Sequence, residues 1–175
     1  LAQLFLDEPV TAVWGQPFVV RDSSAEHTLG GGQVLQPTAA KIRRRHLEYL
    51  ERVERLWSPD ADTRATMAAW FAAFHGFHPA DLVRAAGVAP AAADATVARL
   101  AAGGSVVALS LPPNRVLHIH ADRIAELEER ILDALGVLHE QHPLMTNHDR
   151  QKTLARLDYV GDEALLQAVT DRLLK

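Results

Sequence analysis

The sequence predicts an α+β chain in which a short β segment precedes tandem helix-turn-helix modules. Two observations carry this fold class. Short apolar runs, broken by Pro, Gly and Asp-Ser turns, fill residues 1–37 and are typical of strands. After Pro37 the apolar residues recur at helical spacing, and three helices, a hairpin and three further helices follow the first helical stripe.

Length and composition limit the classes of protein that the chain can represent. With 175 residues, 48% apolar and 23% charged, it has the composition of a globular protein of one domain or a few small modules. The net charge of −4 disfavours a uniformly basic nucleic-acid binder, so any such binding must use local patches. The absence of cysteine excludes disulfides, thiolate zinc sites and a cysteine nucleophile. No apolar run approaches the roughly 20 residues of a membrane span, so we expect no membrane partner and a cytoplasmic location.

The β segment is predicted to contain four strands and to be part of a larger β domain. Four short strands leave unpaired edges and an uncovered apolar face, so we expect earlier strands of that domain to precede Leu1. The glycine run 30–32 lacks side chains to pack, which indicates a bulge or a close approach by another backbone. A phosphate-binding loop is disfavoured because no Lys-Ser/Thr pair follows the glycines. The predicted strands are residues 3–6, 10–14, 18–21 and 28–35.

The helical part begins with a linking helix and continues as a first three-helix module. An apolar stripe that includes Tyr49, Val53 and Leu56 predicts one helix over residues 38–57. Three helices followed by a hairpin are the order of a winged-helix domain, which we assign to residues 58–120. Its predicted elements are helices 61–75, 79–86 and 91–102 and strands 105–110 and 116–119.

A second winged-helix domain with a truncated wing is predicted over residues 121–175. A weak internal match favours a duplication, because the pattern Leu82-x-Arg84-x-x-x-Val88 recurs 72 residues later as Leu154-x-Arg156-x-x-x-Val160. That offset is about the length of one such module. The expected helices are a long one lined by residues 124–138, a short one at 150–157 and a third at 162–174.

The most specific string in the chain runs from Arg21 to Leu35 and reads RDSSAEHTLGGGQVL. It resembles the last strands of the third domain of translational GTPases of the EF-Tu type, where an R-[DE] turn leads to a T-[VLI]-G-[AG]-G-x-V strand. Residues 4–10 and 15–22 resemble the preceding strands of that barrel. The triple glycine, the QVL-x-P ending and the Arg-rich segment after it resemble the bacterial selenocysteine-specific elongation factor (SelB) family, which continues past the barrel into a row of winged-helix domains. The string LHEQHPL at 138–144 resembles the family's second winged helix.

The resemblance implies terminal strands of an EF-Tu-like β-barrel over residues 1–37, followed by tandem winged-helix domains. The family binds GTP and Mg²⁺, delivers selenocysteinyl-tRNA to the ribosome at a recoded UGA, and recognises an mRNA hairpin through its last module. This fragment lacks the GTPase domain, so we expect no cofactor and no enzymatic activity in it, and a role as spacer between tRNA carrier and mRNA reader. In EF-Tu-like proteins the turn before the glycine strand lies near the T stem of tRNA, which places Asp22, Ser23 and His27 there as candidates.

The basic run in the linking helix is the strongest candidate for RNA contact that the residues themselves supply. Residues 41–55 contain six Lys or Arg against three Glu, a local excess of positive charge in an acidic chain. Arginine forks bind phosphate oxygens, with a strength that falls as salt rises. The alternative is a solvated helix whose arginines pair with glutamates at helical spacing. The candidate residues are Lys41, Arg43, Arg44 and Arg45.

Other chemistry finds less support in the sequence. The third helix of each module has few cations, so neither is predicted to read a nucleic-acid groove. Nine histidines invite a metal site, through the groups 75/78, 118/120 or 139/142/148, but surface or capping histidines are the favoured interpretation and no metal is predicted. No nucleophile with a base and no paired carboxylates indicate an active site. The alternative function is a winged-helix transcription regulator or a protein-interaction module, and a metal-dependent enzyme is a third class.

Overall fold

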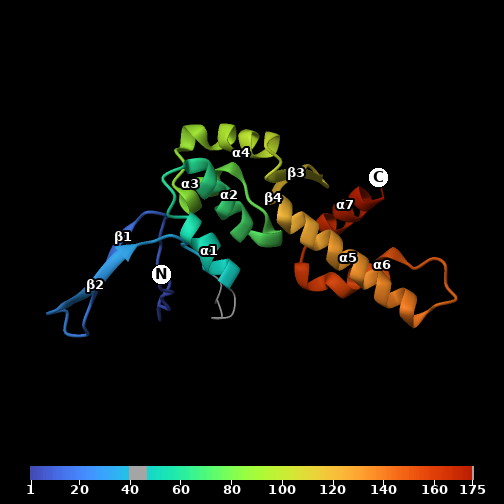
Figure 1. The fold of residues 1–175 in the computed structure, drawn as a ribbon, viewed down its shortest axis with the longest axis horizontal. Coiled ribbons are helices and arrows are strands. Elements are labelled where there is room, and N and C mark those ends of the chain that lie inside the picture. Colours follow the sequence, from blue (N-terminus) through green and yellow to red (C-terminus); the bar gives the residue numbers. More distant parts are fainter. Residues whose placement is uncertain (40–46, 175) are drawn as a thin grey trace. The chain divides into compact units, whose positions relative to one another are not determined.

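The computed structural model describes residues 1–39 and 47–174 (Figure 1). The chain divides into two compact units, of which the first contains Leu1–Phe71 and His78–Leu100 and the second contains Ala72–Phe77 and Ala101–Lys175. Within the described residues, each unit combines helices with a two-stranded antiparallel sheet, so the predicted mixture of α and β structure is confirmed. Among the described helices, none is both long and apolar enough to cross a bilayer.

The first unit contains an antiparallel hairpin of β1 (Pro17–Arg21) and β2 (Thr28–Gln33), drawn in blue in Figure 1. Both predicted strands of this hairpin are confirmed, although β2 ends two residues before Leu35. Gly31 makes the close approach expected of the glycine run, because a Cβ atom on it would lie 2.5 Å from the carbonyl oxygen of Phe18. Any side chain at this position would therefore push the two strands apart.

The predicted strands at residues 3–6 and 10–14 are wrong. Neither segment pairs as a strand in the part of the chain that the structure describes. A strand requires neighbouring backbone groups along its edge. The backbone N–H of Trp14 instead donates to the carbonyl oxygen of Arg84 over 2.8 Å. Arg84 belongs to a helix, so the end of this segment is held by helical structure and not by a sheet.

The linking helix is shorter than predicted. The described helix is α1 (Leu47–Arg55), whereas the apolar stripe predicted residues 38–57. Residues 38 and 39 are not helical, so the predicted start is wrong, and residues 40–46 lie outside the described residues. Tyr49 of α1 meets the rings of Trp70 and Phe71 edge-on, with ring centres 5.0 and 5.3 Å apart. These aromatic contacts seat α1 against the next helix.

The three helices predicted for the first module are present. The middle one has the predicted bounds, and Gly87 ends it with a φ of 64° and an N–H donated to the carbonyl of Leu82. The helix before it stops at Phe71 and not at residue 75, because Ala73 has a φ of 51°, which an α-helix cannot continue. The bounds are α2 Ala61–Phe71, α3 Pro79–Ala86 and α4 Ala93–Ala102, with 3-10 turns η1 Ala73–His75 and η2 Pro90–Ala92.

The core of the first unit combines small and large apolar side chains. Alanines let the helix backbones approach closely, and a few Leu, Val and Trp side chains fill the remaining space. Leu56, just after α1, is buried in this core together with residues of α2, α3 and α4. The buried residues are Leu56, Ala65, Met67, Ala68, Ala69, Trp70, Leu82, Ala86, Val88, Ala93, Val97 and Leu100.

The second unit contains a hairpin and three helical segments, close to the predicted elements. The long helix starts earlier than its apolar stripe, because His120 caps it by accepting the N–H of Asp122 over 3.1 Å. The predicted helix at 150–157 is wrong as a single α-helix, since it changes to 3-10 turns in which Leu157 leaves helical geometry. The bounds are β3 Val106–Leu111, β4 Arg115–His120, α5 Ala121–Gln141, α6 Arg150–Leu154, η3 Ala155–Val160 and α7 Glu163–Leu173.

One buried apolar cluster holds the second unit together. The β3–β4 hairpin contributes side chains to the same cluster as α5, η3 and α7. This hairpin, predicted as the wing of the first module, is therefore grouped with the second unit, while the boundary after residue 120 stays a prediction. The cluster consists of Leu111, Leu117, Ile119, Ile124, Leu127, Ile131, Leu154, Leu157, Val160, Leu165, Leu166 and Val169.

Candidate functional site

The turn between β1 and β2 contains the three residues predicted to face tRNA. Asp22 is the first residue of this turn and accepts hydrogen bonds at Oδ1 from the backbone N–H groups of Glu26 and His27, over 3.0 and 3.3 Å. The hydroxyl of Ser24 donates to the same oxygen over 2.9 Å. Oδ2 lies 3.2 Å from Nδ1 of His27. The carboxylate therefore closes the turn like the side chain of an Asx turn.

The three predicted residues of the turn differ in charge, hydrogen bonding and exposure. The N–H of His27, followed by the Ser24 hydroxyl, lowers the pKa of the Asp22 carboxyl. That carboxylate is used inside the turn, so it can position the turn but would repel a phosphate. Ser23 is exposed, and the side chain of His27 is 77% exposed. Of the three residues, Ser23 and His27 are thus available to a partner, and their contact with tRNA stays a prediction.

Replacing Asp22 by Ala is expected to accelerate amide hydrogen exchange at Glu26 and His27, because their N–H groups lose their acceptor. In the unsubstituted chain, the ionised Asp22 carboxylate stabilises the turn, and its pKa is lowered in the folded state. This stabilisation is present above about pH 3.8, the ordinary pKa of the group, and is lost as the pH falls through the lower folded-state pKa. Exchange measured by NMR tests both statements. A Ser23→Ala variant is the control and should leave these amides unchanged; equal rates in the Asp22 variant and the original chain would contradict the positioning role.

The predicted RNA-contacting residues Lys41, Arg43, Arg44 and Arg45 lie outside the described residues. The structure therefore shows only the helix that follows them. In α1, Arg52 lies 3.6 Å from Glu48 and over the ring of Trp70, with its guanidinium carbon 4.3 Å from the ring centre. The alternative of intrahelical pairing thus holds for Arg52, which follows the four candidate residues in the chain.

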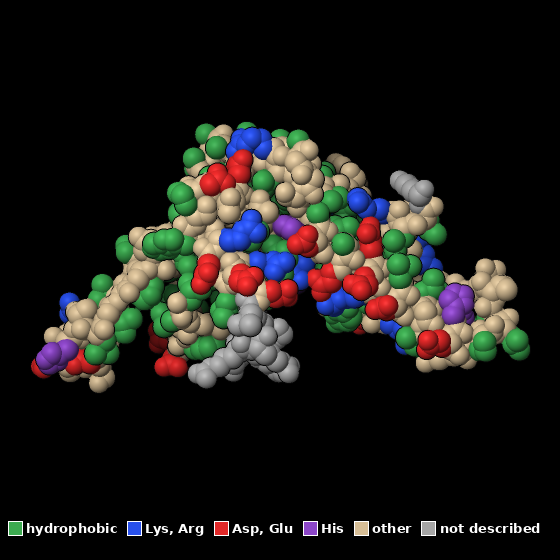
Figure 2. Space-filling model, viewed as in Figure 1, with side chains coloured by type: hydrophobic (Ala, Val, Ile, Leu, Met, Phe, Trp, Pro, Cys, Tyr) green, Lys and Arg blue, Asp and Glu red, His purple; other side chains and the backbone are tan. Residues whose placement is uncertain are grey.

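The arginines of the two helical modules are largely used within the fold. Most of them lie close to a carboxylate of the same unit, and Figure 2 shows the resulting mixture of Lys or Arg with Asp or Glu on one face. A guanidinium held by a carboxylate is less available to a phosphate. This supports the prediction that these helices are poor nucleic-acid readers. The pairs are Arg84–Asp81, Arg99–Asp62, Arg115–Asp162, Arg123–Glu126, Arg130–Glu126, Arg150–Asp171 and Arg172–Glu128.

A socket around Trp14, which the sequence analysis missed, joins the N-terminal segment to the helices of the first unit. The indole Nε1–H of Trp14 donates to the carbonyl of Leu56 over 2.8 Å, and its backbone N–H donates to that of Arg84 over the same distance. The ring lies directly against Gly87, where even a Cβ atom would overlap it. We call Trp14, Arg64 and Gly87, with the carbonyls that they contact, the Trp14 socket.

Arg64 forms the other wall of the Trp14 socket. Its guanidinium lies over the indole at 4.3 Å from the ring centre. Three backbone carbonyls, of Ser58, Pro59 and Ala86, accept its N–H groups over 2.8 to 2.9 Å. The residue is only 8% exposed, so these acceptors compensate much of the cost of burying its charge. The only signal for this role in the sequence is an arginine on the apolar side of a predicted helix.

The base of the β1–β2 hairpin is tied directly to the Trp14 socket. Gly15, which follows Trp14 in the chain, donates its N–H to the carbonyl oxygen of Val34 over 2.7 Å. The N–H of Val34 in turn donates to the carbonyl oxygen of Gln16 over 2.9 Å. These hydrogen bonds join the two ends of the hairpin to each other, and Trp14 directly precedes the first of them in the chain. The predicted tRNA-facing turn, the hairpin and the helices of the first unit therefore belong to one connected structure.

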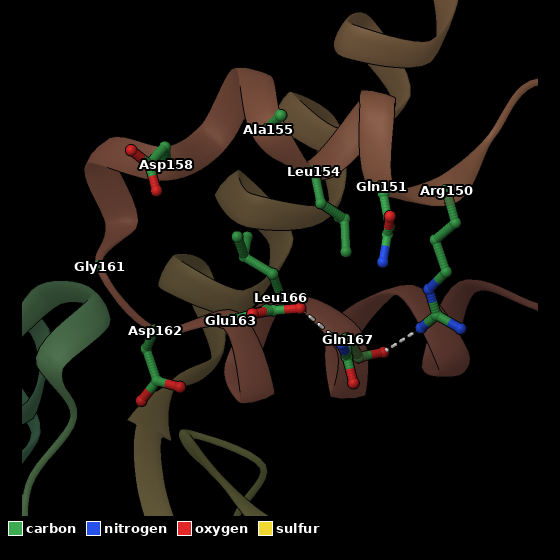
Figure 3. Close-up of a pocket in the computed structure, with 10 residues that line it drawn as sticks. All are labelled: Arg150, Gln151, Leu154, Ala155, Asp158, Gly161, Asp162, Glu163, Leu166 and Gln167. Atoms are coloured by element: carbon green, nitrogen blue, oxygen red, sulfur yellow. Dashed lines mark hydrogen bonds between the residues drawn. The ribbon is translucent and has the colours of Figure 1, made fainter.

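A groove in the second unit between α6, η3 and α7 has a volume of about 370 Å³ (Figure 3). Arg150 spans it and donates to the carbonyl of Gln167 and to Asp171, over 2.8 and 2.9 Å. Asp158, Asp162 and Glu163 are among the other residues that line it, together with apolar and neutral polar residues. None of the predicted site residues lies here, and the acidic lining does not suit an anionic ligand.

The histidine groups considered as metal ligands behave differently from one another. His120 is a capping residue, as one of the favoured interpretations expects. His139 and His148 come into contact, with Nδ1 of the former 3.1 Å from Nε2 of the latter. Over residues 1–39 and 47–174, no three His, Asp or Glu side chains form a group able to hold a metal ion.

The hairpin contains the string that, by its sequence, resembles the last strands of a translation-factor β-barrel. Residues 1–41 match the family described as the selenocysteine-specific elongation factor, beta-barrel domain. This match supports a SelB-related protein and covers the hairpin and the Trp14 side of the socket. A comparison with curated proteins gave no match.

Proposed function

We propose that this chain is the part of a selenocysteine-specific elongation factor that connects its tRNA-binding barrel to its mRNA-reading end. Residues 1–37 would end the barrel, and the two helical modules would be tandem winged-helix domains that act as a spacer. The family match over residues 1–41 is the observation that carries this proposal. The whole factor would bind GTP and Mg²⁺ elsewhere and would act in the cytoplasm, on selenocysteinyl-tRNA, the ribosome and an mRNA hairpin.

The Trp14 socket supports the spacer role. A spacer sets a distance only if its joint with the tRNA carrier is stiff. Two hydrogen bonds of 2.8 Å, a buried guanidinium over the indole and contact with Gly87 restrict the joint at Trp14. Residues that match the barrel family are thereby connected to the first helical module without reliance on a flexible linker.

RNA contact through the basic run is the second part of the proposal. The run concentrates four cations within five residues, 41–45, whereas the arginines of the helical modules are mostly paired with carboxylates. Cations that bind phosphates release counterions from the nucleic acid. Residues 41–45 follow the hairpin that would lie near the T stem, so tRNA or ribosomal RNA is the partner that fits.

Replacing Arg43, Arg44 and Arg45 together by Ala is expected to weaken binding of the 175-residue chain to a labelled selenocysteine tRNA by about tenfold or more at low salt. Up to three phosphate contacts would be lost, so the slope of log K against log salt should fall by about two. Fluorescence anisotropy at KCl concentrations from about 50 to 200 mM measures both the affinity and the slope of log K against log salt.

The matched control removes the same number of charges from ion pairs, by replacing Arg84, Arg99 and Arg172 with Ala. This variant should bind tRNA as the original chain does. Equal weakening by the two triple substitutions would contradict the assignment of the basic run. Tighter binding to duplex DNA than to tRNA would favour the transcription-regulator alternative. The gene encoding this chain should also encode a P-loop GTPase domain ahead of Leu1, and a natural start at Leu1 would contradict the proposal.

A further inference from the structure

Three histidines gather where α5 ends and α6 begins, outside every site described above. His139 lies in the last turn of α5, and His142 ends that helix with its N–H donated to the carbonyl of Leu138 over 3.0 Å. The chain then turns back, with the N–H of Met145 donated to the carbonyl of His142 over 2.9 Å. This return brings His148 against His139.

The arrangement is held by the helix end that follows. Asp149, the neighbour of His148, caps α6 by accepting the N–H of Gln151 over 2.9 Å. The imidazoles of His139 and His148 are thus presented near two helix ends, where Leu138 and Leu154 are both buried. A pair of side chains positioned in this way needs little rearrangement to share a ligand.

The distance between the two imidazoles suits a shared metal ion. Nδ1 of His139 and Nε2 of His148 are 3.1 Å apart, and the rings cross at 82° with centres 4.3 Å apart. Two nitrogens bound to one ion at about 2.0–2.1 Å lie roughly 3 Å from each other. The ring of His142 is centred 6.3 Å from that of His148.

The protonation state also suits metal binding. Desolvation, followed by the nearby His139, His142 and Lys152, lowers the pKa of His148. A lowered pKa favours the neutral imidazole, which is the form that coordinates a metal ion. Imidazole ligands without thiolates select Zn²⁺, Cu²⁺ or Ni²⁺ over Mg²⁺ or Ca²⁺.

We propose that His139 and His148 form a two-histidine binding site for one transition-metal ion of the Zn²⁺ class, with water completing the shell. The ion would tie the end of α5 to the start of α6. It would thereby order residues 142–149, whose Leu144 is 97% exposed. The proposal does not depend on the role of the chain in translation.

Titration of the untagged, ¹⁵N-labelled 175-residue chain with ZnCl₂ tests this site. We expect the imidazole nitrogens of His139 and His148 to shift together in NMR spectra, with saturation at one equivalent. In calorimetry, His148→Ala should weaken Zn²⁺ binding at least tenfold. His75→Ala and His27→Ala, which remove histidines elsewhere in the chain, should leave the affinity unchanged.

Three results would overturn the proposal. One is an absence of saturable binding at micromolar to millimolar Zn²⁺. Another is equal loss of affinity in the His148, His75 and His27 variants, which would indicate diffuse binding by surface histidines. The third is binding in which the His139 and His148 nitrogens do not shift. The side chain of His148 lies outside the apolar cluster, so His148→Ala should fold like the original chain. Matching far-ultraviolet circular dichroism spectra of the two proteins would confirm this.

Discussion

Replacing Gly87 by Ala should destabilise the first unit by about 3 kcal/mol and loosen the Trp14 socket. Gly87 has a φ of 64°, a conformation that costs a residue with a side chain about 1–2 kcal/mol. The new Cβ atom would also overlap the indole of Trp14, and overpacking of this kind costs about 1–3 kcal/mol. Urea unfolding followed by circular dichroism measures the loss.

Gly161→Ala is the matched control for this prediction. Gly161 also ends a helical segment with a positive φ, 73°, but nothing lies within 4 Å of its Cβ position. It should therefore cost only the backbone part, about 1–2 kcal/mol. In a Trp14→Ala background, Gly87→Ala should cost only the backbone part, because the overlap with the indole is absent. Equal destabilisation by the two glycine substitutions would contradict close contact between Trp14 and Gly87.

Replacing Arg64 by Leu is expected to have a comparable effect, about 3 kcal/mol. The substitution leaves the carbonyls of Ser58, Pro59 and Ala86 without their charged donor. It also removes the cation over the Trp14 ring. Because Arg64 is 8% exposed, water can replace these hydrogen bonds only if the helices separate.

Arg99→Leu is the control for this prediction, because it removes an arginine of the same unit that lies on the surface. Its guanidinium forms a bidentate pair with Asp62 on the surface, at 2.7 and 3.0 Å. Surface pairs contribute little, since water and salt replace them. The Arg99 variant should unfold close to the original chain in urea. An Arg64 variant as stable as the Arg99 variant would show that the buried carbonyl contacts are unimportant.

Local sequence patterns predicted much of the helical structure. The bounds of α3, its end at Gly87 and the hairpin of residues 106–120 follow from Pro, Gly and apolar spacing alone. The glycine run correctly indicated a close backbone approach, which occurs at Gly31. These features depend on neighbours in the sequence or on backbone conformation, so a single chain contains enough information to predict them.

The failures have a common physical cause. Trp14 was assigned to a strand because its neighbours are apolar, but its partners Leu56 and Arg84 are 42 and 70 residues away. Arg64 reads as an ordinary helical arginine until Ala86 and Trp14 are placed beside it. Long-range contacts of this kind leave no periodic pattern. The contacts of the Trp14 socket could therefore not be predicted, although the sequence contains all of its residues.

The most direct test of the spacer proposal is to measure residual dipolar couplings for the hairpin and the helices of the first unit in the 175-residue chain. We predict one alignment tensor for β1, β2, α2 and α3, because the Trp14 socket makes them one body. In the Gly87→Ala variant the hairpin and the helices should need separate tensors. Separate tensors in the unsubstituted chain would contradict a stiff joint, and with it the role of this chain as a spacer of fixed length.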